Sequence, residues 1–143
     1  MRSQYFRLEN LLVSVVTGEV PTAEVKVYSA HDRDCSTSQG TGTGPVDAIY
    51  RAIDAALDSG PFVVESLTYR SLGEGSDGVG EATVLVAYLG ATFKGVGSDT
   101  DVLRASAEAY IDALNRIESF RSEEGHVRLM GSQLYRSYDS GIA

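Results

Sequence analysis

Residues that support redox chemistry, metal binding and nucleophilic catalysis are scarce in this sequence. Its 143 residues include one cysteine, Cys35, two histidines, His31 and His126, and no tryptophan. A single cysteine excludes a disulfide within the chain, and it makes a reducing compartment, the cytoplasm, the location we expect. Neither histidine has the spacing of a metal ligand or of a base beside a nucleophile. We therefore predict no metal site, no cofactor and no catalytic residue, so an independent enzyme is the least supported function.

Long apolar runs and an excess of positive charge are also missing. No apolar stretch approaches the roughly 20 residues that a membrane-spanning helix needs, and no signal peptide is visible. Lysine and arginine number 12 against 20 aspartates and glutamates, and the resulting net charge of -8 disfavours nucleic acid and anionic membranes as partners. The chain is 43% hydrophobic and long enough to form one domain with its own core.

Glycine, by contrast, is concentrated in a segment that leads into a predicted helix. Gly40, Gly42 and Gly44 alternate with threonine and precede Pro45, which suits the first turn of a helix. Apolar residues then recur at helical spacing: Val46, Ile49, Tyr50, Ile53, Ala56 and Leu57. A helix N-terminus behind a glycine loop is suited to bind a small anion. The alternative is that the glycines only permit a tight turn, and the segment matches neither a Walker A loop nor a dinucleotide fingerprint.

This glycine segment and the strand before it occur twice. Residues 95–105 repeat the order of glycine, one residue, glycine and a polar lead-in to a helix, and residues 78–88 resemble residues 18–28. We interpret the chain as a tandem duplication. The predicted fold class is α+β, with two pseudo-symmetric strand–strand–strand–helix units whose antiparallel sheets pack against two helices.

Alternation and turn residues predict the elements of each unit. In the first unit we expect strands at 5–16, 22–29 and 35–39, and a helix at 45–58 that residues 59–61 stop. In the second we expect strands at 62–72, 81–89 and 92–94, a loop at 73–80, a second glycine loop, and a helix over 99–120. We expect the first strand to be covered on both faces from Leu11 and the strand at 81–89 to be central. Ser98 or Asp99 is the expected cap of the second helix, and a break at 122–125 should begin the tail.

Three segments give the chain a resemblance to a known family. Residues 42–53 (GTGPVDAIYRAI), 75–86 (GSDGVGEATVLV) and 95–117 (GVGSDTDVLRASAEAYIDALNRI) resemble the C-terminal regulatory domain of 2-isopropylmalate synthase, which citramalate synthase shares. The resemblance implies a regulatory domain over residues 1–120, built of repeats at about 5–60 and 61–118, and a C-terminal tail at 121–143. In that family the domain follows a TIM-barrel catalytic domain that condenses acetyl-CoA with a 2-oxo acid.

The resemblance also implies a feedback sensor that forms a homodimer and binds an end-product amino acid at the dimer interface, leucine first and isoleucine second. It places ligand contacts on nine residues: Gly42, Thr43, Gly44, Asp47, Leu67, Ser71, Gly97, Ser98 and Asp99. The helix N-termini would bind the carboxylate of the ligand, and Asp47, Asp99 or Asp101 would bind its ammonium group. Val64, Leu67 and Ser71 would wall its side chain. The barrel that such a sensor regulates would lie in the same protein or in a partner.

Two observations keep a ligand-free dimerisation module open as the alternative. The family often has tyrosine where Leu67 stands and asparagine or aspartate where Thr43 stands, so two polar groups are lost here. Asp47 and Asp101 lie in the first turns of the predicted helices, where a carboxylate stabilises the helix dipole without any ligand. Tyr50 and Tyr110 lie on apolar stripes, so we expect them to pack in the core rather than to contact a ligand.

Overall fold

The computed structural model describes residues 5–58, 62–73 and 78–135 and consists of two units with the same order of elements. The first unit comprises β1 (Phe6–Ser14), β2 (Thr22–Ser29), β3 (Asp34–Thr41) and α1 (Pro45–Leu57). The second comprises β4 (Val63–Ser71), β5 (Gly80–Tyr88), β6 (Ala91–Asp99) and α2 (Val102–Tyr135). Each set of strands forms an antiparallel sheet in chain order. The predicted α+β fold of two strand–strand–strand–helix units is confirmed.

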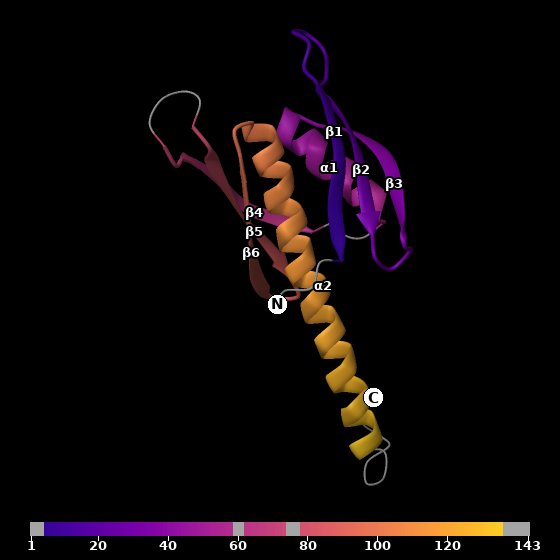
Figure 1. The fold of residues 1–143 in the computed structure, drawn as a ribbon. Coiled ribbons are helices and arrows are strands. Elements are labelled where there is room, and N and C mark those ends of the chain that lie inside the picture. The colour runs from indigo at the N-terminus through magenta and orange to yellow at the C-terminus, as the bar shows by residue number, and fades with distance from the viewer. Residues whose placement is uncertain (1–4, 59–61, 74–77, 136–143) are drawn as a thin grey trace.

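The two helices lie between the two sheets (Figure 1). Helix α1 packs on β2 and β3 of its own unit, α2 packs on β5 and β6, and the helices contact one another. The central strands β2 and β5 point alternate residues toward the helices, as their period of two predicts. These residues are fully or almost fully buried: Ala23, Val25 and Val27 on β2, and Ala82, Val84 and Val86 on β5. The central position expected for the strand at 81–89 is confirmed.

The two sheets share an irregularity that supports the duplication. The register of β1 against β2 shifts between Leu8 and Asn10, and that of β4 against β5 shifts between Val64 and Ser66. In both cases the extra residue is a glutamate, Glu9 or Glu65, and the shift begins at the residue paired two positions before the end of the central strand, Val27 of β2 and Val86 of β5. Because a bulge is a local feature that families retain, its recurrence at matching positions is evidence for one repeated unit.

The prediction of a second glycine loop is wrong, because Gly95 and Gly97 lie inside β6. Gly40 lies inside β3 in the same way. A methyl group on Gly40 would lie 2.5 Å from the backbone nitrogen of Ala52, and one on Gly97 would lie 2.6 Å from that of Ala109. Both distances are shorter than a side chain tolerates. These glycines therefore let the helices approach the sheets closely, which is a packing role rather than a loop role.

Helix α2 continues to Tyr135, so its expected end at Phe120 and the expected break at 122–125 are wrong. No proline occurs between residues 121 and 135, and the two glycines there, Gly125 and Gly131, cost a helix interior only about 1 kcal/mol each, which does not end it. The extension leaves the body of the domain (Figure 1). No described helix is long and apolar enough to cross a bilayer.

Further differences concern β1 and the strand lengths. Leu12 is 59% exposed, so the expectation that the first strand is covered on both faces is wrong for this chain alone. Strands β3 and β6 are longer than the predicted 35–39 and 92–94, because their glycines belong to them. Helix α1 ends at Leu57, and its C-cap residue Asp58 adopts a left-handed conformation with φ of 49°. The predicted stop at residues 59–61 and part of the predicted loop at 73–80 lie outside the described residues.

Candidate functional site

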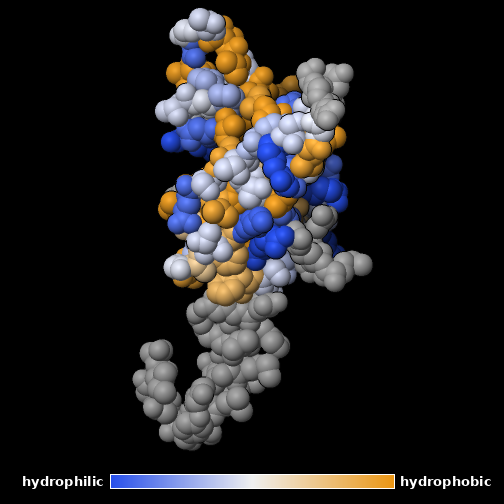
Figure 2. All heavy atoms as spheres, turned by 90° about the vertical axis from the view of Figure 1, so that its left-hand side faces the viewer, coloured by the Kyte–Doolittle hydropathy of each residue, from blue (hydrophilic) through white to orange (hydrophobic). Residues whose placement is uncertain are grey.

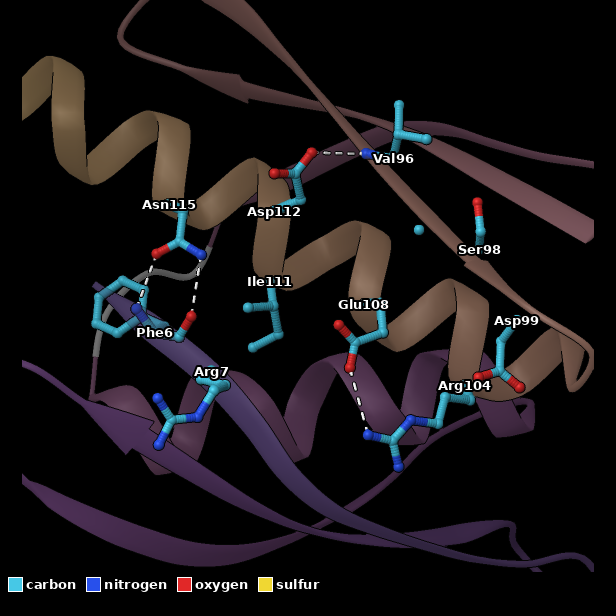
Figure 3. A pocket seen from close by; sticks show the side chains of 11 residues that line it. Phe6, Arg7, Val96, Ser98, Asp99, Arg104, Glu108, Ile111, Asp112 and Asn115 are labelled. Atoms are coloured by element: carbon cyan, nitrogen blue, oxygen red, sulfur yellow. Dashed lines mark hydrogen bonds and ion pairs between the residues drawn. The ribbon is translucent and has the colours of Figure 1, made fainter. Parts of the chain in front are cut away.

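Seven of the nine predicted ligand contacts line one of three pockets. The helix-1 pocket, a cavity of about 470 Å³, contains Asp47 and Leu67. The hairpin pocket, of about 580 Å³ between the β1–β2 turn and the start of α1, contains Gly42, Thr43 and again Asp47. The helix-2 pocket, of about 400 Å³, contains Gly97, Ser98 and Asp99 (Figure 3). The predicted contacts are therefore divided among three places rather than gathered in one.

The remaining two predicted contacts, Gly44 and Ser71, line none of these three pockets. The carbonyl oxygen of Gly44 accepts the backbone N–H of Ala48 at 3.0 Å, as the N-cap residue of α1 does. The hydroxyl of Ser71 donates to the carbonyl oxygen of Gly73 at 3.0 Å. Both polar groups thus serve local structure.

Asp47 lies on the wall that the helix-1 and hairpin pockets share. Its Oδ2 accepts the backbone N–H of Thr43 at 3.0 Å, and the Nε group of Arg51 donates to both of its oxygens at 3.2 and 3.3 Å. The N–H of Thr43, followed by Arg51, holds the pKa of this carboxyl below its usual value. Asp47 therefore ties the first turn of α1 to the residue before its N-cap, and it already has a cationic partner.

The start of α2 differs from that of α1, because an aspartate side chain caps it. The carboxylate of Asp101 accepts the backbone N–H of Leu103 at 2.8 Å, and that of Asp99 accepts the N–H of Asp101 at 2.9 Å. Because α2 begins at Val102, its cap is Asp101, and the expectation of Ser98 or Asp99 is wrong. Carboxylates of the chain itself thus stand at both helix N-termini, where a ligand carboxylate was expected.

A reciprocal pair of tyrosines joins the two helices behind the helix-1 pocket. Tyr50 of α1 donates its hydroxyl to the carbonyl oxygen of Ser106 at 3.1 Å, and Tyr110 of α2 donates to Asp54 of α1 at 2.6 Å. The rings stack with centroids 4.2 Å apart. Both tyrosines are buried, as expected from their apolar stripes. Their hydroxyls lie toward the partner helix, so this contact fixes α1 against α2.

Asp54 is the functional candidate that the sequence pattern did not reveal. It lines the helix-1 pocket together with residues of both units: Val46, Asp47, Tyr50 and Arg51 of α1, Phe62, Val64 and Leu67 at β4, and Tyr110 of α2. Burial raises the pKa of its carboxyl to about 6, although the hydrogen bond from Tyr110 opposes this shift. The pocket therefore combines an apolar wall with an arginine and two carboxylates on one face of α1.

The raised pKa of Asp54 predicts a specific dependence of stability on pH. Between pH 4 and 6 the folded state binds a proton that the unfolded chain releases, so ionisation of Asp54 lowers the free energy of unfolding as pH rises through 6. Asp54→Asn keeps an acceptor for Tyr110 and removes the charge. We expect its melting temperature to exceed that of the wild type at pH 7.5 and this advantage to shrink at pH 5. An advantage that is constant with pH would show that the carboxyl titrates normally.

The helix-2 pocket is the counterpart of the helix-1 pocket in the second unit. Gly40 faces Ala48 and Ala52, whereas Gly95 faces Ala109 and Ala113. Matching Ala48 with Ala109 and Ala52 with Ala113 aligns α1 with α2 at a shift of 61 residues. In this alignment Asp54 corresponds to Asn115, Asp47 to Glu108 and Arg51 to Asp112. The arginine on the helix in one pocket is thus an aspartate in the other, and the helix-2 pocket takes its arginines from other positions, Arg7 and Arg104.

Asn115 closes one end of the helix-2 pocket (Figure 3). Its Oδ1 accepts the backbone N–H groups of Tyr5 and Phe6, both at 2.8 Å, and its Nδ2 donates to the carbonyl oxygen of Phe6 at 3.0 Å. Farther along α2, Arg104 pairs with Glu108 at 3.6 Å, and Asp112 accepts the N–H of Val96 at 2.9 Å. The polar groups that line this pocket are largely engaged with the chain itself.

In the part of the chain that the structure describes, no three histidine, cysteine, aspartate or glutamate side chains are grouped so as to hold a metal ion. Charged residues line all three pockets, and the helix-1 pocket adds to them the apolar side chains that a small-molecule site presents, those of Val46, Phe62, Val64 and Leu67.

Comparison with known proteins gives one consistent result. Residues 1–118 match the family model of the LeuA allosteric (dimerisation) domain. The chain is similar to 2-isopropylmalate synthase of Salinibacter ruber (strain M8), with 36% identity over 133 residues that cover 93% of the chain and 24% of the relative. It is 41% identical to 2-isopropylmalate synthase of Prochlorococcus marinus (strain NATL1A) over 112 residues, 78% of the chain and 20% of the relative. The chain thus spans about a quarter of the length of these relatives or less.

Proposed function

Because the chain belongs to the family of the LeuA allosteric (dimerisation) domain, we propose that it senses a branched-chain amino acid, leucine first, and regulates a catalytic domain by feedback. The matched relatives are named 2-isopropylmalate synthases. A catalytic barrel of that kind would be the regulated partner, in the same protein or in a separate chain. Binding of the amino acid would shift the equilibrium between states of the assembly, which is how coupling between distant sites arises.

The helix-1 pocket is the observation that carries this proposal. A site for a branched-chain amino acid needs a cationic group for the ligand carboxylate, an anionic group for its ammonium group, and an apolar surface for its side chain. Arg51 and the acids on α1 supply the first two, and Phe62, Val64 and Leu67 supply the third. The cavity of about 470 Å³ lies in the range typical of small-molecule sites. Both units contribute residues to it, so a ligand there would stabilise their relative arrangement.

Exposed apolar side chains support the dimer that the family name describes. On β4 and the turn after it, Val63 is 65% exposed and Leu72 is 49% exposed. The β1–β2 turn exposes Val15, Val16 and Val20. Hydrophobic side chains form groups on the face in Figure 2. Apolar surface of this kind, next to the helix-1 pocket at Val64, is suited to a homodimer whose formation also shields the ligand.

The test is the change in melting temperature with leucine, isoleucine or valine, compared with alanine. A ligand at ten times its dissociation constant adds about 1.4 kcal/mol to the free energy of unfolding, which raises the melting temperature of a domain of this size by roughly 3–6 °C. We expect leucine to give this rise and alanine none. A rise with isoleucine alone would instead assign the domain to the citramalate branch.

The second candidate function is a dimerisation module without a ligand, which the loss of polar groups at Thr43 and Leu67 favours. It predicts a dimer in sedimentation or scattering experiments together with an unchanged melting temperature in all four amino acids. That result would contradict the sensor and leave the interface as the function of the domain.

A further inference from the structure

We infer that Asp54 accepts the ammonium group of the amino acid in the helix-1 pocket and that Arg51 binds its carboxylate. This inference rests on the proposed function, because it names the residues that recognise the proposed ligand. The sequence pointed instead to Asp47, Asp99 or Asp101 as ammonium acceptors and to the helix N-termini as carboxylate acceptors.

The contacts of the acids distinguish Asp54 from the other candidates. Asp47 is paired with Arg51 and the N–H of Thr43, and Asp101 is bonded to the N–H of Leu103. Asp99 lines the helix-2 pocket on the other unit. Asp54 has one hydrogen bond, from the neutral hydroxyl of Tyr110, and no cationic partner among the described residues. A half-buried carboxylate that lacks a cation is stabilised strongly when an ammonium group is brought to it.

Arg51 is placed to bind the other charged group of the same ligand. Arg51 and Asp54 are three residues apart on α1 and therefore lie side by side on one face of the helix. Arg51 contacts Asp47 through Nε alone, so within the described part of the chain its two Nη groups are available as donors. A guanidinium group can hold two carboxylates at once because its five N–H bonds point in different directions.

The apolar wall sets the orientation of the ligand. Phe62, Val64 and Leu67 line the pocket from the second unit, opposite the charged face of α1. A zwitterion whose charged groups lie on Arg51 and Asp54 directs its side chain toward these residues. The arrangement therefore fits an α-amino acid with a branched aliphatic side chain and disfavours a monocarboxylic acid without the amino group.

The charged groups around Asp54 make this recognition dependent on pH. Among the described residues that line the pocket, Asp47, Tyr50 and Arg51 lie on the same helix as Asp54, Tyr110 comes from α2, and those at β4 are uncharged. The carboxyl of Asp54 has a pKa of about 6 and must be ionised to hold an ammonium group. The free amino acid does not titrate between pH 5 and 8, so leucine should bind about tenfold more weakly at pH 5.0 than at pH 7.5, following the fraction of ionised Asp54.

The experiment is titration calorimetry of leucine at pH 5.0 and 7.5 with the wild type, Asp54→Asn and Asp58→Asn. Asp58 is the matched control, because it is the C-cap residue of the same helix, is exposed, and has a left-handed backbone that asparagine also adopts. We expect Asp54→Asn to bind leucine at least tenfold more weakly at pH 7.5 and to lose the dependence on pH. Asp58→Asn should behave as the wild type does.

A ligand without the amino group provides an independent measurement. 4-Methylpentanoate has the side chain and carboxylate of leucine, so the wild type should bind it far more weakly than leucine, whereas Asp54→Asn should discriminate less between the two. The melting temperature of Asp54→Asn, expected to be at least that of the wild type at pH 7.5, verifies that the variant is folded.

The outcomes separate this inference from the function on which it rests. If the wild type binds no branched-chain amino acid at either pH, both are overturned. If the wild type binds leucine but Asp54→Asn binds it as tightly and with the same pH dependence, only the role of Asp54 is overturned. Loss of affinity and of pH dependence in Asp54→Asn alone supports it.

Discussion

Gly95→Ala is expected to destabilise the domain by more than about 3 kcal/mol, enough to leave a substantial fraction unfolded at 37 °C. A methyl group at this position would overlap the carbonyl oxygen of Ala109 and lie 2.5 Å from the backbone nitrogen of Ala113. Both atoms belong to the backbone of α2, which cannot turn aside as a side chain can. The helix would have to move off β6, and this would disrupt the packing of the buried residues around Ala109 and Ala113. Urea unfolding followed by circular dichroism measures the loss.

Gly44→Ser is the matched control for this prediction. No atom lies within 4 Å of the place that its Cβ would take, and the φ of Gly44, at -149°, is open to any residue. Serine is also a better N-cap than glycine by a few tenths of a kcal/mol. Gly44→Ser should therefore be as stable as the wild type or slightly more so. If Gly95→Ala unfolds at the same urea concentration as the wild type, α2 is not held against β6 as closely as the structure indicates.

The misplaced glycines show which part of the fold the sequence could predict. Alternation over residues 22–29 and 81–89 predicted two strands, which are the central strands of the two sheets. A period of two is visible in the strand's own sequence and requires no knowledge of the strands or helices that pack against it. The role of Gly95 depends on a helix that follows later in the chain. A glycine that ends a strand and a glycine over which a helix packs have the same local sequence, so only tertiary contacts distinguish them.

The candidate site depended on the same kind of information. Asp47 could be placed in the first turn of α1 from the position of Pro45 alone. Asp54 lies outside the apolar stripe of that helix and would ordinarily be solvated. It becomes half-buried only because Tyr110 of α2 and the residues at β4 close over it. The contact of Asp54 with Tyr110 and the residues at β4 joins the two units, and the periodicity of neither unit predicts it. The sequence therefore provided no reason to expect Asp54 in the site.

Asn115→Ala is the second substitution for which we expect a large loss, about 2–3 kcal/mol of unfolding free energy. Asn115 is 4% exposed and makes three hydrogen bonds with the backbone of Tyr5 and Phe6. Alanine would leave those backbone groups without their partner, at roughly 1 kcal/mol each, and the gain in helix propensity offsets about 0.5 kcal/mol of this loss. The expected decrease in melting temperature is about 5–10 °C.

The asparagine on β1 supplies the control for this loss. Asn10 is exposed, so Asn10→Ala should change the free energy of unfolding by less than about 0.5 kcal/mol. The contrast has a structural reason, because Asn115 joins the first strand of one unit to the helix of the other. Its loss should also increase amide hydrogen exchange at the start of β1 before the rest of the sheet. Unchanged stability and exchange in Asn115→Ala would mean that the two units are held together without this contact, through their other contacts such as the tyrosine pair between α1 and α2.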